Sequence, residues 1–296
     1  MAPDVSIIIL SWNTLSLLAN CLRSIPQGIG TLDVEILVVD NGSSDGSQEM
    51  VRQQFPHVCL IENGQNLGFA RANNQAMAAS HGRYVLLLNS DTIVQPKAIE
   101  AMVACADADS TIGVVGAQLL NADGSFQASH TRFPTLWHEF LILSRLGRLW
   151  YGSWYPSHGP GQSQQPADAD YVEGACLLAR REAVTQVGGL DEGYFMYAEE
   201  VDWCFNMRRA GWRVAYVPQA RIIHLSGGSS KSSTRREALL YRGRVRFFRK
   251  NHGSWRAAIL KAMIYASTAI KLVWHRLRRG RAVVGWRELR AALQEA

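Results

Sequence analysis

Residues 84–91 read Tyr84-Val85-Leu86-Leu87-Leu88-Asn89-Ser90-Asp91, and this stretch indicates the fold class. The unbroken apolar run before Asn89 is typical of a strand that is buried on both faces, as strands are inside a parallel sheet. Polar groups follow where such a strand would leave the core, and ligands of open α/β sheets bind at the carboxyl ends of strands. A carboxylate at Asp91 could hold a hard cation and, through it, a diphosphate. It could equally cap the turn that follows.

Two earlier segments repeat this pattern of an apolar strand with a polar end. Val5–Leu10 is followed by Ser11-Trp12-Asn13, and Val34–Val39 is followed by Asp40. Helical patterns lie between the strands, so the chain predicts an α/β fold with a mostly parallel, Rossmann-like sheet flanked by helices. The polar ends at Asn13, Asp40 and Asp91 are expected to lie side by side at one edge of that sheet, where they suggest a nucleotide site.

Neither of the two common phosphate-binding loops is present. The first strand-helix turn lacks the G-x-G-x-x-G fingerprint, and the chain contains no G-x-x-x-x-G-K-[ST] loop. A nucleotide must therefore be held in another way. Asp40 could accept hydrogen bonds from a base or ribose, while Asp91 and a metal ion hold the phosphates.

The chain continues this alternation of strands and helices up to residue 226. Pro26 is expected to stop the first helix. Residues 121–169 have weak periodicity, which predicts a long loop with one helix, 136–149, that could cover a site. The other predicted helices lie near 46–55, 66–82, 97–108 and 198–211, and the other strands near 58–61, 113–117, 171–179, 214 and 222–223.

Length and composition permit one large α/β domain with appendages, or two domains. At 47% hydrophobic residues, the 296-residue chain has ample material for a core. Five scattered cysteines without a C-x-x-C pair indicate a reducing compartment and argue against a disulfide framework or a zinc site. No basic region precedes the first strand, so no signal peptide is expected.

Charge is distributed unevenly along the chain. Residues 1–207 contain 10 Lys/Arg and 22 Asp/Glu, a net charge of −12, whereas residues 208–296 contain 21 and 3, a net charge of +18. A basic segment joined to an acidic body indicates a polyanionic partner, which could be a nucleic acid, a phosphorylated substrate or an anionic membrane.

Residues 255–296 are helical by propensity. The part from Ala257 to Trp274 is mostly apolar but contains Lys261 and Lys271, and the basic run His275–Arg281 follows it. The segment is short and charged for a membrane-spanning helix, which favours a helix lying on a membrane surface. The alternative is a C-terminal helix packed on the domain.

Three acids, Glu199, Glu200 and Asp202, stand at the start of the helix predicted near 198–211. Acids in a first helical turn offset the helix macrodipole, and that is their structural interpretation. Two features favour a functional one. Three acids are more than capping needs, and the neighbouring aromatic residues, Trp203 among them, could form a wall for a sugar. A carboxylate that faces a hydroxyl can act as a general base.

His224 follows an apolar strand and precedes the Gly- and Ser-rich segment Leu225–Lys231. A lone histidine is commonly structural, but here it could ligate a metal ion while backbone N–H groups and Lys231 hold phosphate oxygens. A basic series follows, which could bind a phosphorylated acceptor or lipid headgroups, or could form a solvated helix face. Its members are Arg235, Arg236, Arg242, Arg244, Arg246, Arg249 and Lys250.

These motifs, in this order, resemble the family 2 glycosyltransferases, which are inverting enzymes of the GT-A fold. The resemblance covers roughly residues 4–226 and is greatest for the rhamnosyltransferase-like branch, which builds bacterial surface polysaccharides, often on a polyprenyl-diphosphate carrier. The segments that carry it are Val5–Ile9, Val38–Ser47, Asn66–Ala70, Leu87–Asp91, Glu173-Gly174, Gly189–Glu192, Ala198–Asp202, Arg209–Trp212 and His224.

The resemblance implies a role for each motif. Asp40 contacts the nucleotide base, Asp91 is the acid of the Asp-x-Asp-type motif that binds Mg²⁺ or Mn²⁺, and His224 completes metal or diphosphate binding. The residues expected near the acceptor are Glu173, Gly174, Asp202 and Trp203. The residues expected to bind the donor are Ser11, Asn13, Asp40, Asn41, Gly68, Arg71, Asn74, Asn89 and Ser90.

The catalytic base of the family is the acid of a Glu-Asp motif, whose second position falls on Glu200. This chain departs from the motif because it has Glu199-Glu200 there, which leaves both residues as candidates. The metal motif departs as well, since Asn89-Ser90-Asp91 offers the cation a single carboxylate. The Gln-x-x-Arg-Trp motif of processive synthases is absent, which favours transfer of a single sugar.

The implied function is transfer of one sugar, rhamnose by overall resemblance, from a dTDP- or UDP-sugar to a hydroxyl of a glycan or polyprenyl-diphosphate-linked acceptor. The expected division is a GT-A domain over residues 1–226, with its donor half at about 1–120 and its acceptor half at about 121–226, and a basic helical C-terminal extension over 227–296. The expected location is cytoplasmic, peripheral on the inner membrane, with an anionic membrane surface as partner and no nucleic acid.

Two other functions are compatible with an α/β sheet of this kind. A nucleotidyltransferase that makes sugar nucleotides would need an early Gly-rich, basic loop, which the turn Ser11–Asn13 does not offer. A catalytically inactive, membrane-bound scaffold would have no need for the acids at 91, 200 and 202 or for His224.

Overall fold

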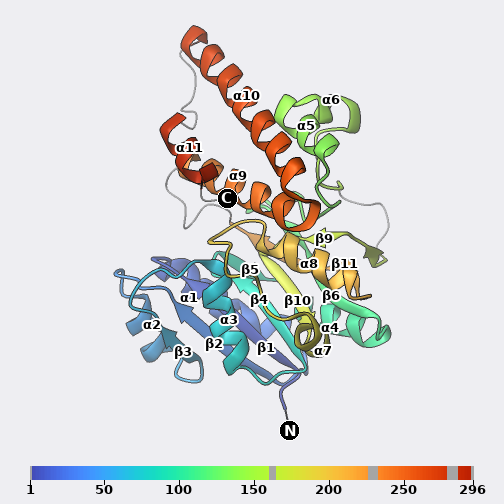
Figure 1. The fold of residues 1–296 in the computed structure, drawn as a ribbon. Coiled ribbons are helices and arrows are strands. Elements are labelled where there is room, and N and C mark those ends of the chain that lie inside the picture. The colour runs from blue at the N-terminus through green and yellow to red at the C-terminus, as the bar shows by residue number, and fades with distance from the viewer. Residues whose placement is uncertain (1, 160–164, 226–232, 279–285, 295–296) are drawn as a thin grey trace.

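A mixed β-sheet runs through the centre of the protein, with helices on both faces and a further group of helices at one end (Figure 1). The computed structural model describes residues 2–159, 165–225, 233–278 and 286–294. Within these residues, nine strands form the central sheet in the order β3-β2-β1-β4-β10-β6-β11-β5, with β8 paired to β11. Their bounds are β1 Val5–Ser11, β2 Val34–Asp40, β3 Cys59–Glu62, β4 Tyr84–Asn89, β5 Thr92–Val94, β6 Ile112–Leu120, β8 Ala167–Asp168, β10 Cys176–Arg180 and β11 Arg213–His224. A separate small sheet pairs β7 (His130–Thr131) with β9 (Tyr171–Val172).

Successive residues of a strand point to opposite faces of the sheet, so each buried apolar run contributes to two cores. Leu86 and Leu88 of β4 pack in one core with α1 and α4. Val85 and Leu87 pack in the other with α3 and α8. The helices are α1 Leu15–Gly28, α2 Ser47–Gln54, α3 Phe69–Ala79, α4 Ala98–Ala108, α5 Leu136–Ser144, α6 Leu146–Tyr151, α7 Arg181–Val187, α8 Glu199–Arg209, α9 Ser233–His252, α10 Ser254–Arg278 and α11 Trp286–Gln294.

The three polar strand ends lie at one edge of the sheet, as the sequence predicts. β1 lies between β2 and β4 and is parallel to both, with Ser11 opposite Asp40 and Leu10 opposite Asn89. Beyond β4 the sheet is mixed, because β10 runs antiparallel to both β4 and β6. The predicted α/β class with a mostly parallel sheet is therefore confirmed.

Several predicted boundaries differ from the structure. Helix α1 continues through Pro26 to Gly28; a proline removes a single helical hydrogen bond, and here the helix ends two residues later anyway. The strand predicted at 171–179 is divided into β9 and β10 by Glu173-Gly174-Ala175. Conversely, the two segments predicted near 214 and 222–223 form one strand, β11, which shifts register against β6 between Val217 and Arg221.

The region predicted as a long loop with one helix contains two helices. Helix α5 begins after Thr135, whose hydroxyl accepts a hydrogen bond from the backbone N–H of His138. It ends at Arg145, where a left-handed φ of 63° turns the chain into α6. A left-handed residue interrupts helical hydrogen bonding, so the apolar pattern of 136–149 is carried by two short helices. We call the segment 136–151 the α5–α6 hairpin.

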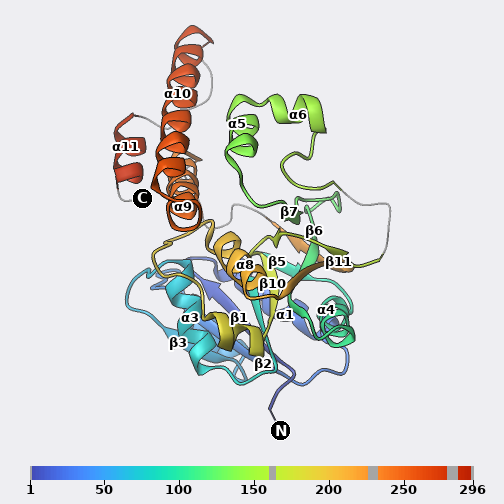
Figure 2. The same ribbon diagram turned by 45° about the vertical axis from the view of Figure 1, so that its right-hand side comes forward.

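The C-terminal helices form a packed group beside α8 (Figure 2). Leu260 and Ile264 of α10 are buried in one cluster with Val245 and Phe248 of α9 and with Val201 of α8. One face of α10 is therefore packed on the protein, which was one of the two predicted alternatives. No described helix is both long enough and apolar enough to cross a lipid bilayer.

Part of the predicted C-terminal features falls outside the described residues. These include the boundary at 226–227, Lys231 in its Gly- and Ser-rich segment, and the end of the basic run, 279–281.

Candidate active site

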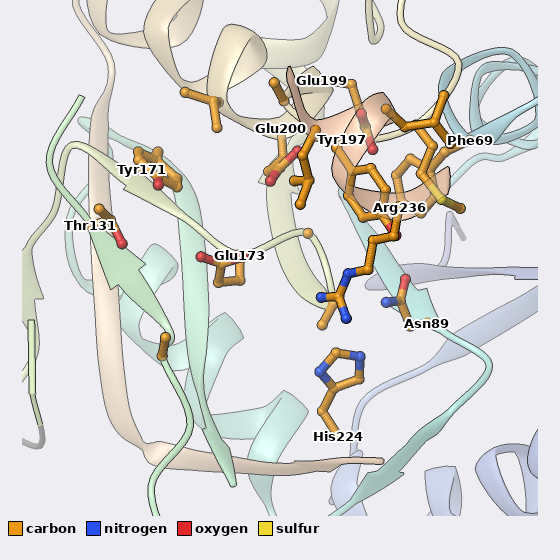
Figure 3. Close-up of a pocket in the computed structure, with 18 of the residues that line it drawn as sticks. Phe69, Asn89, Thr131, Tyr171, Glu173, Tyr197, Glu199, Glu200, His224 and Arg236 are labelled. Atoms are coloured by element: carbon orange, nitrogen blue, oxygen red, sulfur yellow. The ribbon is translucent and has the colours of Figure 1, made fainter. Parts of the chain in front are cut away.

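A cavity of about 1890 Å³ opens at the carboxyl edge of the sheet. Strand ends, the segment between β6 and β9, the start of α8 and one face of α9 all contribute to its wall, part of which is drawn in Figure 3. The sequence-predicted residues in the wall are Asn13, Asn41, Gly68, Asn89, Ser90, Asp91, Glu173, Gly174, Glu199, Glu200 and His224. The tertiary structure thus brings together residues that are up to about two hundred positions apart.

Asp40 and Ser11 lie buried beneath this wall. One carboxylate oxygen of Asp40 accepts hydrogen bonds from the backbone N–H of Ser43 at 2.9 Å and from the Gln48 side chain at 2.7 Å. Its other oxygen, Oδ2, is buried without a hydrogen-bond partner among the described residues. Ser11 contacts the hydroxyl of Thr14 at 3.0 Å. A buried acceptor without a donor is costly. Within the described part of the chain, Oδ2 of Asp40 is such an acceptor, although neither Asp40 nor Ser11 lines the cavity.

Two asparagines join the loops at the strand ends. Asn13 has a left-handed φ of 53°, and its Oδ1 accepts a hydrogen bond from the backbone N–H of Ser44 at 2.8 Å. The Nδ2 group of Asn41 donates to the backbone carbonyl of Gly68 at 3.2 Å. A Cβ at Gly68 would lie only 2.6 Å from the carbonyl oxygen of Phe195, so glycine allows this loop to lie against the segment before α8. These contacts shape the cavity wall.

Asp91 and His224 meet on one side of the cavity. The His224 Nε2 atom lies 3.4 Å from Oδ1 of Asp91. Gln127 determines which ring nitrogen of His224 faces the acid. The Nε2 group of Gln127 donates to the backbone carbonyl of His224 at 3.2 Å. This turns the Oε1 atom of Gln127 toward Nδ1 of His224, at 2.7 Å. An amide oxygen only accepts, so Nδ1 carries a proton. When the ring is neutral, the Nε2 lone pair therefore faces a carboxylate oxygen, an arrangement that fits a cation between them.

Three carboxyl groups line the side of the cavity formed by β9 and α8. Burial, and then the charge of Glu200, raise the pKa of Glu173 to about 8. The same two causes raise the pKa of Glu199 well above its ordinary value, and its Oε2 is buried without a partner among the described residues. Burial also raises the pKa of Glu200, but backbone N–H groups at the N-terminus of α8 favour its charged form. The carboxyl groups of Glu173 and Glu200 point into the same part of the cavity (Figure 3).

The backbone before Glu199 is strained. Tyr197 and Ala198 both have left-handed φ values, 73° and 72°, although neither is a glycine. Helix α9 packs directly on this turn at Gly243, where an added Cβ would lie 2.4 Å from the carbonyl oxygen of Tyr197. Strain of this kind persists only where the surrounding structure holds it, and it is concentrated at functional sites.

The structure separates the basic series of α9 into two groups. Arg244 pairs with the buried Glu139 at 3.0 Å, Arg246 with Asp191 at 2.9 Å, and Lys250 with Asp191 and Asp202 at 2.7 and 2.8 Å; these cations attach the helix to the rest of the protein. Arg235 and Arg236 line the cavity, as the paired Arg244 also does. The guanidinium of Arg236 lies 6.0 Å from the centre of the Tyr197 ring. Figure 3 shows its side chain extending between the carboxylates and His224.

Comparison with known proteins identifies the family to which the chain belongs. A family model described as glycosyl transferase family 2 matches residues 6–188. The N-acetylglucosaminyl-diphospho-decaprenol L-rhamnosyltransferase of Mycobacterium tuberculosis is 31% identical over 265 residues, which cover 84% of this chain and 86% of that protein. The chain belongs to glycosyl transferase family 2. A second similar protein, the rhamnosyltransferase WbbL of Escherichia coli, is 27% identical over 67% of this chain and 75% of its own length.

A solved structure agrees with this family 2 assignment at the level of the fold. The mannosyltransferase PcManGT from Pyrobaculum calidifontis, in complex with GDP-Man and Mn²⁺, superposes with a TM-score of 0.58 at 17% identity, covering 100% of this chain and 86% of that one. The predicted GT-A fold and glycosyltransferase activity are confirmed. The nucleotidyltransferase and inactive-scaffold alternatives receive no support from these comparisons.

Besides Ser11 and Asp40, which lie beneath it, four residues predicted for the site of this family 2 glycosyltransferase lie outside the cavity wall. Arg71 is exposed on α3, and Asn74 bonds to the backbone N–H and carbonyl of Leu190 at 2.9 and 2.8 Å. Asp202 accepts from Lys250 and Asn251, and Trp203 is buried with its indole N–H donating to a backbone carbonyl. Asn74, Asp202 and Trp203 thus make hydrogen bonds within the protein framework, and their roles in ligand binding stay predictions.

Gln127 is a site residue that the sequence did not reveal. It lies in a segment of weak periodicity, and its partner His224 is 97 positions away. Arg236 was one of seven basic residues in the sequence, and nothing in the local pattern distinguished it from Arg246 or Lys250. In the structure, the direction in which each side chain leaves α9 distinguishes Arg236 from the others.

Proposed function

We propose that this chain is an inverting rhamnosyltransferase that moves one sugar from a dTDP- or UDP-linked donor to a hydroxyl of a lipid-linked glycan. Two similar family members are named as rhamnosyltransferases, and the name of one includes a diphospho-decaprenol acceptor. The observation that carries the proposal is a single cavity with a cation-binding pair, Asp91 and His224, on one side and carboxyl groups on the other. Inverting transfer needs stabilisation of the leaving diphosphate on one side of the reacting carbon and a base for the acceptor hydroxyl on the other.

Glu200 is the better candidate for the catalytic base than Glu199. A group must be ionised to accept a proton, and burial, together with an oxygen that has no partner among the described residues, raises the pKa of Glu199 strongly and so favours its protonated form. Glu200 is partly exposed to the cavity and is favoured in its charged form by the N-terminus of α8. Its raised pKa brings it closer to neutrality, which suits a general base that deprotonates the acceptor hydroxyl.

The residues present fit a divalent cation, Mg²⁺ or Mn²⁺. Among the described residues, no group of three or more His, Cys, Asp or Glu side chains converges to hold a metal. Magnesium sites of nucleotide-using enzymes, however, commonly take one or two protein ligands and complete the shell with substrate phosphates and water. Asp91 and His224 supply two such ligands. When bound, the ion would stabilise the charge that develops on the leaving diphosphate.

Arg236 is placed to bind phosphate oxygens from the other side. Its guanidinium lies in the cavity between His224 and the carboxyl groups (Figure 3), and its charge lowers the pKa of Glu173 against the effect of burial. A guanidinium can bind two phosphate oxygens at once. It therefore complements Asp91 and His224 in holding a diphosphate.

A lipid-linked acceptor also requires that the enzyme work at a membrane. We therefore include peripheral association with the cytoplasmic face of the inner membrane in this proposal. The surplus of cations in residues 208–296 supports it, because anionic headgroups attract such a segment.

The test is to compare Glu200→Gln with Glu199→Gln. Glu200→Gln is expected to lower the transfer rate by about 10²–10⁴-fold, the contribution of a positioned base. Glu199→Gln replaces a protonated carboxyl group with an amide of the same shape, so transfer is expected to stay within a few-fold of wild type. The measurement is single-turnover transfer of a radiolabelled sugar, with donor affinity determined separately by calorimetry.

Both variants are expected to bind the donor normally, because neither acid belongs to the diphosphate-binding side. Near-normal transfer by Glu200→Gln would rule out its assignment as the base. Loss of transfer in Glu199→Gln alone would assign that role to Glu199.

A further inference from the structure

The α5–α6 hairpin carries a group of exposed aromatic side chains. Trp137 is 52% exposed and Trp150 59% exposed. Their rings stack with centroids 6.4 Å apart, and Phe140 stacks on Trp137 at 5.5 Å. Leu149 beside them is 78% exposed. Single apolar residues scattered over a surface are normal. A contiguous patch of large apolar side chains marks a binding face. We call these residues the hairpin patch.

Helix α10 packs beside the hairpin and carries exposed apolar residues of its own. Its residue Ser267 donates a hydrogen bond to the backbone carbonyl of Leu143, at the end of α5. Beyond that contact, Ile270 and Val273 are 60% and 57% exposed and lie three residues apart, on one side of the helix. Both views show α10 and the hairpin projecting from the same end of the protein, away from the sheet (Figures 1 and 2).

The charge of this end is one-sided. Between Phe133 and His158 the chain has one acidic residue, Glu139, which is buried and paired with Arg244, while Arg145 and Arg148 are exposed. From residue 254 to residue 278 the sequence contains no Asp or Glu. Glu237 of α9 is partly buried and pairs with Lys271 of α10. An apolar, tryptophan-containing face with an excess of cations complements the interface of an anionic bilayer, where indole rings are favoured.

The opposite side of the hairpin belongs to the cavity. Pro134, His138, Ile142 and Tyr151 line its wall, whereas the residues of the hairpin patch do not. If the hairpin patch rests on a lipid surface, the cavity on the other side of the hairpin therefore lies next to the lipid headgroups.

We propose that the hairpin patch and the outer face of α10 near Ile270 and Val273 dock on an anionic lipid surface, so that a lipid-linked acceptor reaches the cavity along the inner side of the hairpin. The second half of this statement rests on the proposed function; the docking itself does not. The membrane contact then includes a segment in the middle of the sequence, residues 136–151, in addition to the C-terminal helix α10.

The test compares vesicle binding of the full-length protein with that of Trp137→Ser/Trp150→Ser. Co-sedimentation uses vesicles of phosphatidylcholine with and without phosphatidylglycerol. The wild-type protein is expected to bind the anionic vesicles, and the double variant is expected to lose about tenfold or more in partitioning, because insertion scales with the apolar area buried. The matched control is Trp255→Ser on α10, an exposed tryptophan about 22 Å closer to the sheet along the helix axis than Ile270. It is expected to bind as wild type does.

Transfer to a water-soluble, short-chain acceptor separates this proposal from the proposed function. The double variant is expected to retain that activity and its melting temperature, because neither tryptophan lines the cavity. If the wild-type protein binds anionic vesicles but transfers to neither acceptor, and the double variant loses vesicle binding, the docking surface is supported and the proposed function is contradicted. Equal vesicle binding by the wild-type and double variant overturns the docking surface. So does self-association of the wild type that the double variant lacks, without vesicle binding, because the patch then binds a second copy of the chain.

Discussion

Glu199 and Glu200 are neighbours in sequence with the same side chain, and their surroundings make them different acids. Glu199 is 4% exposed and has an oxygen with no partner among the described residues. Glu200 faces the cavity beside Gly174. A Cβ added at Gly174 would lie 3.5 Å from the Cβ of Glu200. Because ionisation is disfavoured in proportion to burial, the pair can divide the work, one acid keeping its proton and the other accepting one.

The cation-binding pair can be tested at the same scale. Asp91→Ala is expected to abolish the Mn²⁺-dependent part of donor affinity, because it removes a metal ligand. Gln127→Leu is expected to weaken that part by about 10–100-fold, the typical cost of losing the hydrogen bond that orients a ligating histidine. Calorimetry with the nucleotide sugar, with and without Mn²⁺, measures both.

Gln53→Leu is the control for the change from an amide to an apolar side chain, since Gln53 is exposed on α2. Its donor affinity is expected to equal that of the wild type. The opposite outcome is that Asp91→Ala binds the donor independently of Mn²⁺ and as tightly as the wild type does with Mn²⁺. That result would count against the metal role of Asp91 and His224.

At the scale of elements, the position of α8 depends on α9. The turn at Tyr197 and Ala198 has unfavourable backbone dihedral angles, and α9 contacts it through a glycine in the middle of a helix. Glycine lowers helix stability by about 1 kcal/mol relative to alanine. A glycine at this position is explained by the close approach of two backbones, which holds the first turn of α8 at the cavity.

Gly243→Ala is therefore expected to destabilise the protein by about 1–3 kcal/mol, the cost of forcing an extra methyl group into a packed contact, despite the better helix propensity of alanine. It is also expected to reduce transfer, since the displaced turn precedes Glu200. Chemical denaturation and single-turnover transfer measure the two effects.

Gly64→Ala is the matched control, because nothing lies within 4 Å of a Cβ added there. It is expected to change stability by no more than a few tenths of a kcal/mol. Gly243→Ala with wild-type or higher stability would show that α9 does not constrain the turn.

For the whole molecule, the uneven charge of the sequence is partly neutralised inside the fold. Arg244, Arg246 and Lys250 of the basic segment pair with Glu139, Asp191 and Asp202 of the acidic one. These cations need no external partner. Around α10, Lys271 likewise pairs with Glu237 of α9, whereas Arg235 and Arg236 line the cavity.

Stability of the whole protein is expected to fall as pH rises. Glu173 has a pKa of about 8 in the folded protein against 4.5 ordinarily, and that of Glu199 is raised as well. The stability that these groups contribute is fully present below the unfolded pKa and is lost as pH rises through the folded one, because the unfolded chain releases protons that the folded protein retains. Denaturant titrations between about pH 5 and pH 8 measure the slope.

Glu199→Gln has no proton to release at this position, so its free energy of unfolding is expected to decline less steeply with pH than that of the wild type. The two slopes are expected to differ by up to about 1.4 kcal/mol per pH unit. The variant and the wild type then diverge toward high pH. Identical slopes in the two proteins would show that Glu199 ionises in the folded state, and would also remove the reason for preferring Glu200 as the base.

The sequence alone determined the fold class and the alignment of Asn13, Asp40 and Asp91 at one edge of the sheet. These features follow from local patterns, namely apolar runs that end in polar residues and the short helices that keep strands parallel. The helix at 198–211 and its acids were predictable for the same reason. The family resemblance rests on the same segments.

The tertiary structure decided what the local pattern does not contain. The orientation of His224 depends on Gln127, 97 residues away, and the sorting of the basic series depends on which face of α9 meets the protein. The different proton affinities of Glu199 and Glu200 depend on burial, which is a property of surrounding segments rather than of the residue. Partners distant in the chain and exclusion of water are set only when the elements pack. For that reason the fold and the kind of activity could be predicted from the sequence, while the hydrogen-bond partners and the proton affinities of the site residues could not.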